Sequence, residues 1–114
     1  MNGDAKAQKF IAAAADHGRY TLEGDFKACN EAYDRVVLSA TELRKSEDGG
    51  RASFEGLLIH PDMSVRLWAA AYLLRHNESA ALKTLNEVAS GSGLVAFDAE
   101  MTAKEWKAGR LKLL

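Results

Sequence analysis

The segment Met63–His76 constrains the fold most, because it is apolar on nearly every side of a helix. It reads MSVRLWAAAYLLRH, and Asp62 directly before it can cap the first turn by accepting a backbone N–H. A helix at a protein surface keeps one polar face, so a helix that is apolar all round has to be covered on several sides. Residues 63–76 are therefore predicted to form the central helix of the chain.

The rest of the chain supplies helices that can cover this segment. A single proline in 114 residues and alanine runs at 12–15 and 69–71 favour helix over strand. Short loops between amphipathic helices favour antiparallel neighbours. We therefore expect an all-α fold of stacked antiparallel helix pairs, with about six helices in one domain over 1–114. Besides 63–76, apolar periodicity predicts helices over 4–17, 25–45, 51–59, 78–90 and 94–108.

Helix boundaries follow from turn and capping residues. Gly18 is predicted to stop the first helix, with residues 18–24 as a connector and 46–50 as a loop. Pro61 ends the third helix near Ile59, whereas Asn77 and Ser92 are expected to cap the last two helices. Residues 109–114 are expected to form a loose end or a short docked segment. Along 25–45, spacings of three and four predict a buried stripe of Phe26, Cys29, Tyr33, Val36, Val37, Ala40 and Leu43.

Charge and cysteine content exclude several classes of protein. The chain carries 15 basic and 16 acidic residues without a basic stripe, so no nucleic-acid partner is expected. Cys29 is the one cysteine, which precludes an internal disulfide and suits a reducing compartment. No secretory signal opens the sequence, and its apolar runs are too short to span a membrane. A cytoplasmic protein of bacterial type is expected, with no membrane association.

The sequence predicts no catalytic, cofactor or metal site. His17, His60 and His76 are the only histidines, and no two of them are three or four residues apart as helical metal ligands are. The Gly91-Ser92-Gly93 break lacks the lysine and the glycine spacing of a phosphate loop. Cys29 is interpreted as a buried small hydrophobe.

Four residues are candidates for contacts with a partner or ligand: Arg66, Trp68, Trp106 and Asp98. Both tryptophans could anchor a partner, although helical spacing also suits them to a core. Arg66 lies among apolar neighbours, where a guanidinium needs a partner. The alternatives are an internal ion pair with Asp62 or Asp98, and a ligand contact.

The stretch Leu57–Leu74 resembles a HEAT repeat, through Leu57-Leu58, Pro61-Asp62 and Val65-Arg66-x-x-Ala69-Ala70-x-x-Leu73. The chain is also similar to a bacterial family of small HEAT-like domains, domain-of-unknown-function family two thousand and nineteen. That resemblance adds Gly93-Leu94-Val95-x-Phe97-Asp98-Ala99 and Glu105-Trp106-Lys107-x-Gly109. It implies an all-helical domain, and related helical-repeat proteins serve as interaction modules, some of them as immunity proteins beside secreted toxins.

Two functions are consistent with these features. The first is a non-enzymatic protein-interaction module, such as a toxin-immunity or adaptor protein. Its expected partner is a protein, and a toxin is one candidate. The alternative is a small-molecule-binding helical domain with a pocket between helices, using Arg66, Tyr72 and Asp98. A third hypothesis is self-association through apolar helices, which would make the protein a homo-oligomer.

Overall fold

The structure is a computed structural model that describes residues 2–111, with side chains from residue 5 onward. The described residues form helices joined by turns and contain no strand, which confirms the predicted all-α fold class. Residues 112–114 of the predicted tail lie outside it. The six helices are α1 (Asn2–Glu23), α2 (Phe26–Arg44), α3 (Arg51–Leu57), α4 (Met63–Leu73), α5 (Glu78–Ala89) and α6 (Leu94–Lys107).

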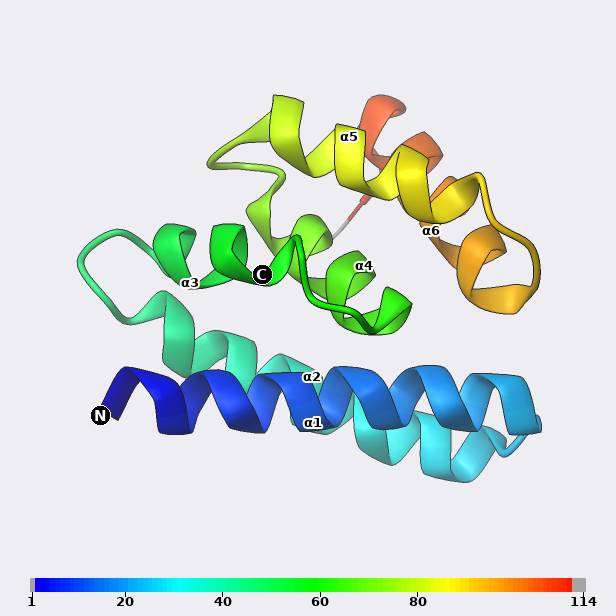
Figure 1. The fold of residues 1–114 in the computed structure, drawn as a ribbon, viewed down its shortest axis with the longest axis horizontal. Coiled ribbons are helices and arrows are strands. Elements are labelled where there is room, and N and C mark those ends of the chain that lie inside the picture. The colour runs from blue at the N-terminus through cyan, green and yellow to red at the C-terminus, as the bar shows by residue number, and fades with distance from the viewer. Residues whose placement is uncertain (1, 112–114) are drawn as a thin grey trace.

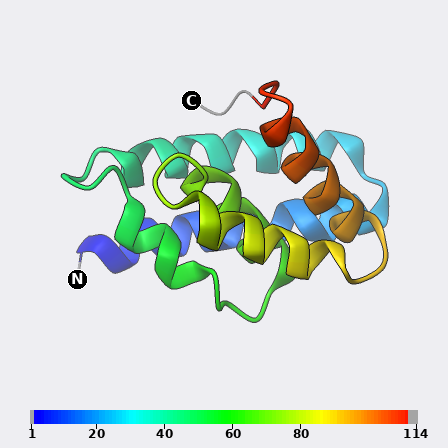
Figure 2. The same ribbon diagram turned by 90° about the horizontal axis from the view of Figure 1, so that it is seen from above.

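The helices stack as three successive antiparallel pairs. Figure 1 shows α1 and α2 at one side of the molecule, α3 and α4 in the middle, and α5 and α6 at the other side. Seen from above in Figure 2, α6 crosses the end of the molecule where α1 finishes and α2 begins. The stacked pairs agree with the prediction from short interhelical loops.

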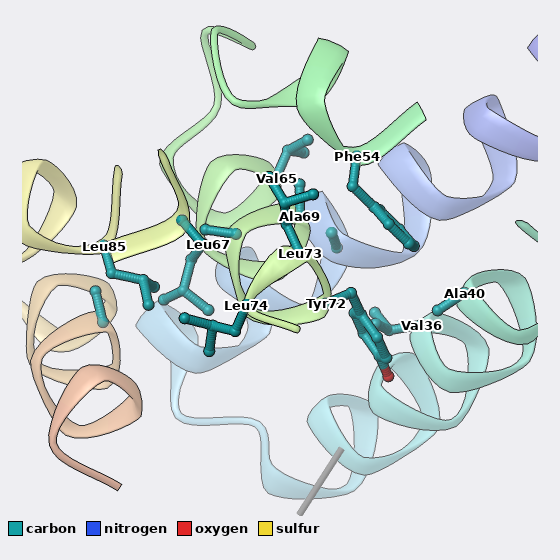
Figure 3. Close-up of a cluster of buried hydrophobic side chains, with 14 of the residues drawn as sticks. Val36, Ala40, Phe54, Val65, Leu67, Ala69, Tyr72, Leu73, Leu74 and Leu85 are labelled. Carbon is teal, nitrogen blue, oxygen red and sulfur yellow. The ribbon is translucent and has the colours of Figure 1, made fainter. Parts of the chain in front are cut away.

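Helix α4 is the central helix, as its sequence predicts. It packs against α1, α3, α5 and α6, and eight of its eleven residues are buried. In the close-up of Figure 3, Tyr72 extends toward Val36 and Ala40 of α2, while Leu74 lies on the side of Leu85 from α5. The helix ends at Leu73, three residues earlier than predicted, since the backbone N–H groups of both His76 and Asn77 donate to the Leu73 carbonyl.

Three aromatic rings join α1, α3 and α4 at the centre of the core. The Phe10 ring of α1 meets the Phe54 ring of α3 edge-on at 5.4 Å, and the Tyr72 ring of α4 stacks on Phe54 at 5.7 Å. Both phenylalanines are fully buried. Burying a side chain of this size contributes about 1.5–3 kcal/mol, so this cluster is a principal support of the stacked pairs.

Most predicted caps are present. The Asp62 carboxylate accepts the backbone N–H groups of Ser64 and Val65 at 2.8 and 3.0 Å, and the Asn77 side chain accepts the N–H of Ala80. The prediction of a Ser92 cap is wrong. Helix α6 begins after Gly93, whose φ of 96° suits glycine, and no side chain caps its first turn.

The buried stripe of α2 differs from the predicted one. Val36, Ala40 and Leu43 are buried as expected, but Ala32 and Ser39 complete the stripe. Phe26, the first residue of α2, is 81% exposed. Tyr33 is 42% exposed because it lies one position round the helix from the buried face that begins at Ala32. Cys29 and Val37 are half-buried, so Cys29 is less buried than the interpretation as a buried small hydrophobe predicts.

Gly18 does not end the first helix, which continues for five more residues to Glu23. The glycine is buried where α1 crosses α4, and a Cβ built on it would lie 2.5 Å from the Ser64 Cβ. No side chain fits there without movement of one helix. The glycine therefore permits a close helix crossing, and its effect on packing outweighs its low helix propensity.

The substitution Gly18→Ala is expected to destabilise the fold by about 1–3 kcal/mol through overpacking, even though alanine is the better helix former. Gly56→Ala in α3 is the matched control, because nothing lies within 4 Å of its added Cβ. That control should raise the free energy of unfolding by up to about 1 kcal/mol. Urea unfolding measures both, and equal effects of the two substitutions would contradict the close crossing.

Candidate functional site: a cleft between α1, α2, α4 and α6

A cleft of about 380 Å³ opens between α4 on its floor and α1, α2 and α6 on its sides. This volume lies within the roughly 300–1,000 Å³ typical of sites for small molecules. Leu111, just after α6, also contributes to it, so the segment 109–111 is docked. The lining residues are His17, Thr21, Tyr33, Ser64, Leu67, Trp68, Ala71, Val95, Asp98, Met101, Thr102, Glu105 and Leu111.

Aromatic rings from three helices gather in the cleft around Trp68. The His17 ring of α1 meets the indole edge-on, with centroids 5.2 Å apart and planes at 85°. The Tyr33 ring of α2 lies at 5.8 Å with a tilt of 54°. Behind the indole, Tyr72 stacks at 6.4 Å, and burial raises the pKa of that phenol to about 12. The indole is therefore held between neighbours on several sides, and His17 and Tyr33 extend the aromatic surface into the cleft.

The cleft contains a histidine and a carboxylate that affect one another. Burial lowers the pKa of His17, and the nearby Asp98 partly opposes that shift. Burial raises the pKa of Asp98, and His17 partly opposes it. Within residues 5–111, no lysine or arginine forms an ion pair with Asp98. Desolvation dominates both groups, so each is held toward its neutral form.

The second carboxylate of the cleft is already paired. The Glu105 oxygens accept two bonds from the Arg110 guanidinium, at 2.9 and 3.2 Å. These bonds lower the pKa of Glu105. Asp98 is consequently the carboxylate of the cleft whose charge lacks a described basic partner.

The threonine hydroxyls of the cleft bond to their own helices. Thr21 Oγ1 donates to the His17 carbonyl and Thr102 Oγ1 to the Asp98 carbonyl, both at 2.8 Å. Thr21 Oγ1 also lies 3.2 Å from Cys29 Sγ. No hydroxyl or thiol among the described residues hydrogen-bonds to the His17 ring, so the cleft does not show the bonded nucleophile and base of a hydrolase.

Of the four candidate contact residues predicted from the sequence, the structure places two in the cleft and two outside it. Trp68 and Asp98 both line the cleft, but Arg66 lies outside it. The predicted ion pair of Arg66 with Asp62 or Asp98 is wrong. The Arg66 guanidinium instead donates to the backbone carbonyls of His60 and Pro61, at 2.8 and 3.3 Å, because the turn before α4 presents these oxygens to it.

Trp106 and Tyr72 also lie outside the cleft. The Trp106 indole N–H donates to Glu78 Oε2 at 2.8 Å, which joins α6 to the start of α5. Tyr72 packs behind Trp68 in the core. Of the predicted pocket residues Arg66, Tyr72 and Asp98, only Asp98 lines this cleft.

Sequence reasoning missed His17 and Tyr33 as residues of the site. The sequence predicts that the first helix ends at His17, which places His17 and Thr21 on different segments. It also predicts Tyr33 in the buried stripe of the second helix. A continuous helix through Gly18 would have placed His17 and Thr21 four residues apart on one face.

Two further searches of the described residues give negative results. No three histidine, cysteine, aspartate or glutamate side chains come together as a metal site would require. None of the helices combines the length and apolar character needed to cross a membrane.

The family described as Domain of unknown function (DUF2019) matches residues 4–106. The chain belongs to this family. Its fold is similar to the crystal structure of the protein RPA1889 from Rhodopseudomonas palustris CGA009, with a TM-score of 0.87 and 23% sequence identity. That alignment covers 100% of this chain and 95% of the other. A search of curated proteins finds no match.

Asp98→Asn is expected to raise the thermal stability at neutral pH. Burial raises the folded-state pKa of Asp98, so the folded state binds the proton more tightly and stability falls as the pH rises from the unfolded value of 3.8 through the folded pKa. The neutral amide avoids that loss. The gain should therefore shrink as the pH is lowered toward 3.8. Thermal unfolding measures it, with the exposed Glu87→Gln on α5 as a control, and equal stability of parent and variant at every pH would contradict the assignment.

Proposed function

We propose that this DUF2019 domain is a non-enzymatic binding protein and that the cleft is its binding site. The observation that carries the proposal is the convergence of His17, Tyr33, Trp68 and Asp98, from four different helices, on one cavity of about 380 Å³. A mostly apolar cavity with a few polar groups is the usual form of a small-molecule site. Perturbed pKa values at His17 and Asp98 favour the same location.

Binding without catalysis accounts for the chemistry of the cleft. The hydroxyls of Thr21 and Thr102 donate to backbone carbonyls, and the Glu105 carboxylate is held by Arg110. Catalysis by a histidine usually requires a partner within hydrogen-bond reach. A His17–Asp98 pair set in aromatic surroundings suits recognition of a ligand by shape and charge.

Thr102→Trp is expected to fill the cleft and to weaken ligand binding at least tenfold. Thr41→Trp on α2 is the matched control, because Thr41 is exposed and its hydroxyl also donates to a carbonyl four residues earlier, at 2.8 Å. A fragment library screened by amide chemical-shift mapping gives the readout. Fragments should shift the resonances around Trp68 in the parent and in Thr41→Trp, but not in Thr102→Trp. A library without any fragment that does so would contradict the proposal.

A protein-interaction module, of the adaptor or toxin-immunity kind, is the second candidate. Its support is four exposed apolar side chains on the segments where α1 finishes and where α2 and α6 begin. These segments lie at the same end of the molecule in Figure 1. These side chains are Leu22, Phe26, Leu94 and Phe97, each more than half exposed. Exposed apolar side chains gathered at one place are typical of interaction surfaces.

The double substitution Phe26→Ser, Phe97→Ser is expected to abolish partner binding while changing stability by no more than about 1 kcal/mol, since both side chains are exposed. Leu38→Ser, at an equally exposed site on α2, is the control. Protection of cells from a toxin encoded beside this gene, compared among the three chains, is the measurement. Sedimentation at two concentrations tests self-association through the same surface. Equal protection by all three chains would reject this surface.

A further inference from the structure

We infer that the cleft selects a small organic cation, specifically an alkylated ammonium group carried on a compact apolar body. The inference rests on the proposed function, in that it takes the cleft as the binding site and names the chemical class of its ligand. Three features of the lining carry it: the aromatic rings, the sign of the charge, and the mostly apolar surface.

The aromatic rings provide the attraction that an alkylated ammonium needs. Trp68, Tyr33 and His17 come from three helices, and the His17 and Tyr33 ring centroids lie 5.2 and 5.8 Å from that of Trp68. Such spacing lets one cation lie within about 6 Å of more than one ring, the range in which the ring quadrupole attracts it. Indole gives the strongest interaction of this kind, and Trp68 is the central ring of the group.

The charge of the lining has the complementary sign. No lysine or arginine is among the lining residues, and Asp98 has no described basic partner. The lowered pKa of His17 favours its neutral ring at neutral pH, and the Glu105 charge is matched by Arg110. A cation would pair with Asp98, whereas an anion would meet that carboxylate without a lysine or arginine on the cleft wall.

The cleft exposes mostly apolar surface, which favours an alkylated ammonium over a bare one. A primary ammonium presents three N–H donors, each of which needs an acceptor after it leaves water. Beyond Asp98 and the paired Glu105, the polar side chains of the cleft are His17, Tyr33 and the three hydroxyls of Thr21, Ser64 and Thr102. The other lining side chains are apolar, so methyl groups on the nitrogen would contact Leu67, Val95 and Met101.

The test compares choline with 3,3-dimethyl-1-butanol, which has the same shape with carbon in place of the charged nitrogen. Both are titrated into the full chain by calorimetry, at low and at physiological ionic strength. Choline is expected to bind at least tenfold more tightly, which corresponds to about 1.4 kcal/mol. Equal or tighter binding of the neutral alcohol would overturn the inference.

Variants assign the selectivity to the cleft. Asp98→Asn and Tyr33→Leu should each weaken binding of choline about tenfold and weaken binding of the neutral alcohol less. The controls are Asp34→Asn, an exposed carboxylate on α2, and Tyr20→Leu, a ring on α1 outside the cleft. Choline binding that survives both cleft variants would overturn the assignment. Thermal unfolding of each variant separates loss of binding from loss of folding.

A capped peptide containing trimethyllysine distinguishes a free cation from a side chain of a partner protein. If choline binds at least as tightly as the peptide, the inference of a small free cation is supported. If only the peptide binds, that inference is overturned. The fragment screen separates this inference from the proposed function. Neutral fragments that Thr102→Trp excludes, together with no preference for choline, would overturn the ligand class and leave the cleft as the binding site. If no probe of any kind enters the cleft, both proposals fail.

Discussion

The burial of α4 on nearly every side is the constraint on which the rest of the structure depends. Eight of its eleven residues are buried, and four other helices pack against it. Because its polar groups are so few, the helix is stable only where neighbours remove its apolar surface from water. The Phe10–Phe54–Tyr72 cluster fixes α1 and α3 against it, while Leu85 and its neighbours fix α5.

The close crossing of α1 and α4 connects this packing to the cleft. Gly18 and Ser64 let the two helices approach, and His17, the residue before that glycine, then meets the Trp68 ring. On the opposite side, α6 packs chiefly on α5 and reaches α1 and α4 less extensively. The cleft occupies the space left between α6 and α2. The site therefore depends on the close crossing of α1 and α4 and on the looser packing of α6 against both helices.

The cleft also contains a group that lowers the stability of the fold. A carboxylate at position 98, half-buried beside His17 and without a described basic partner, costs stability in its ionised form, as its raised pKa indicates. A core selected for stability alone would place an apolar residue there. Residues that break a local rule without structural gain are often functional, which is why we propose that Asp98 contributes to binding.

The sequence by itself determined the helical class, the central position of α4, the caps at Asp62 and Asn77, and the family resemblance that the comparisons confirm. These follow from periodicity and local capping, which depend on residues close together in the chain. Only the tertiary structure decided that Gly18 is a crossing point, that Arg66 bonds to backbone carbonyls, and that His17, Tyr33, Trp68 and Asp98 share one cleft. A helical pattern records which face of a helix is buried, but it does not record which helices meet or how closely, and the cleft is made by those distances.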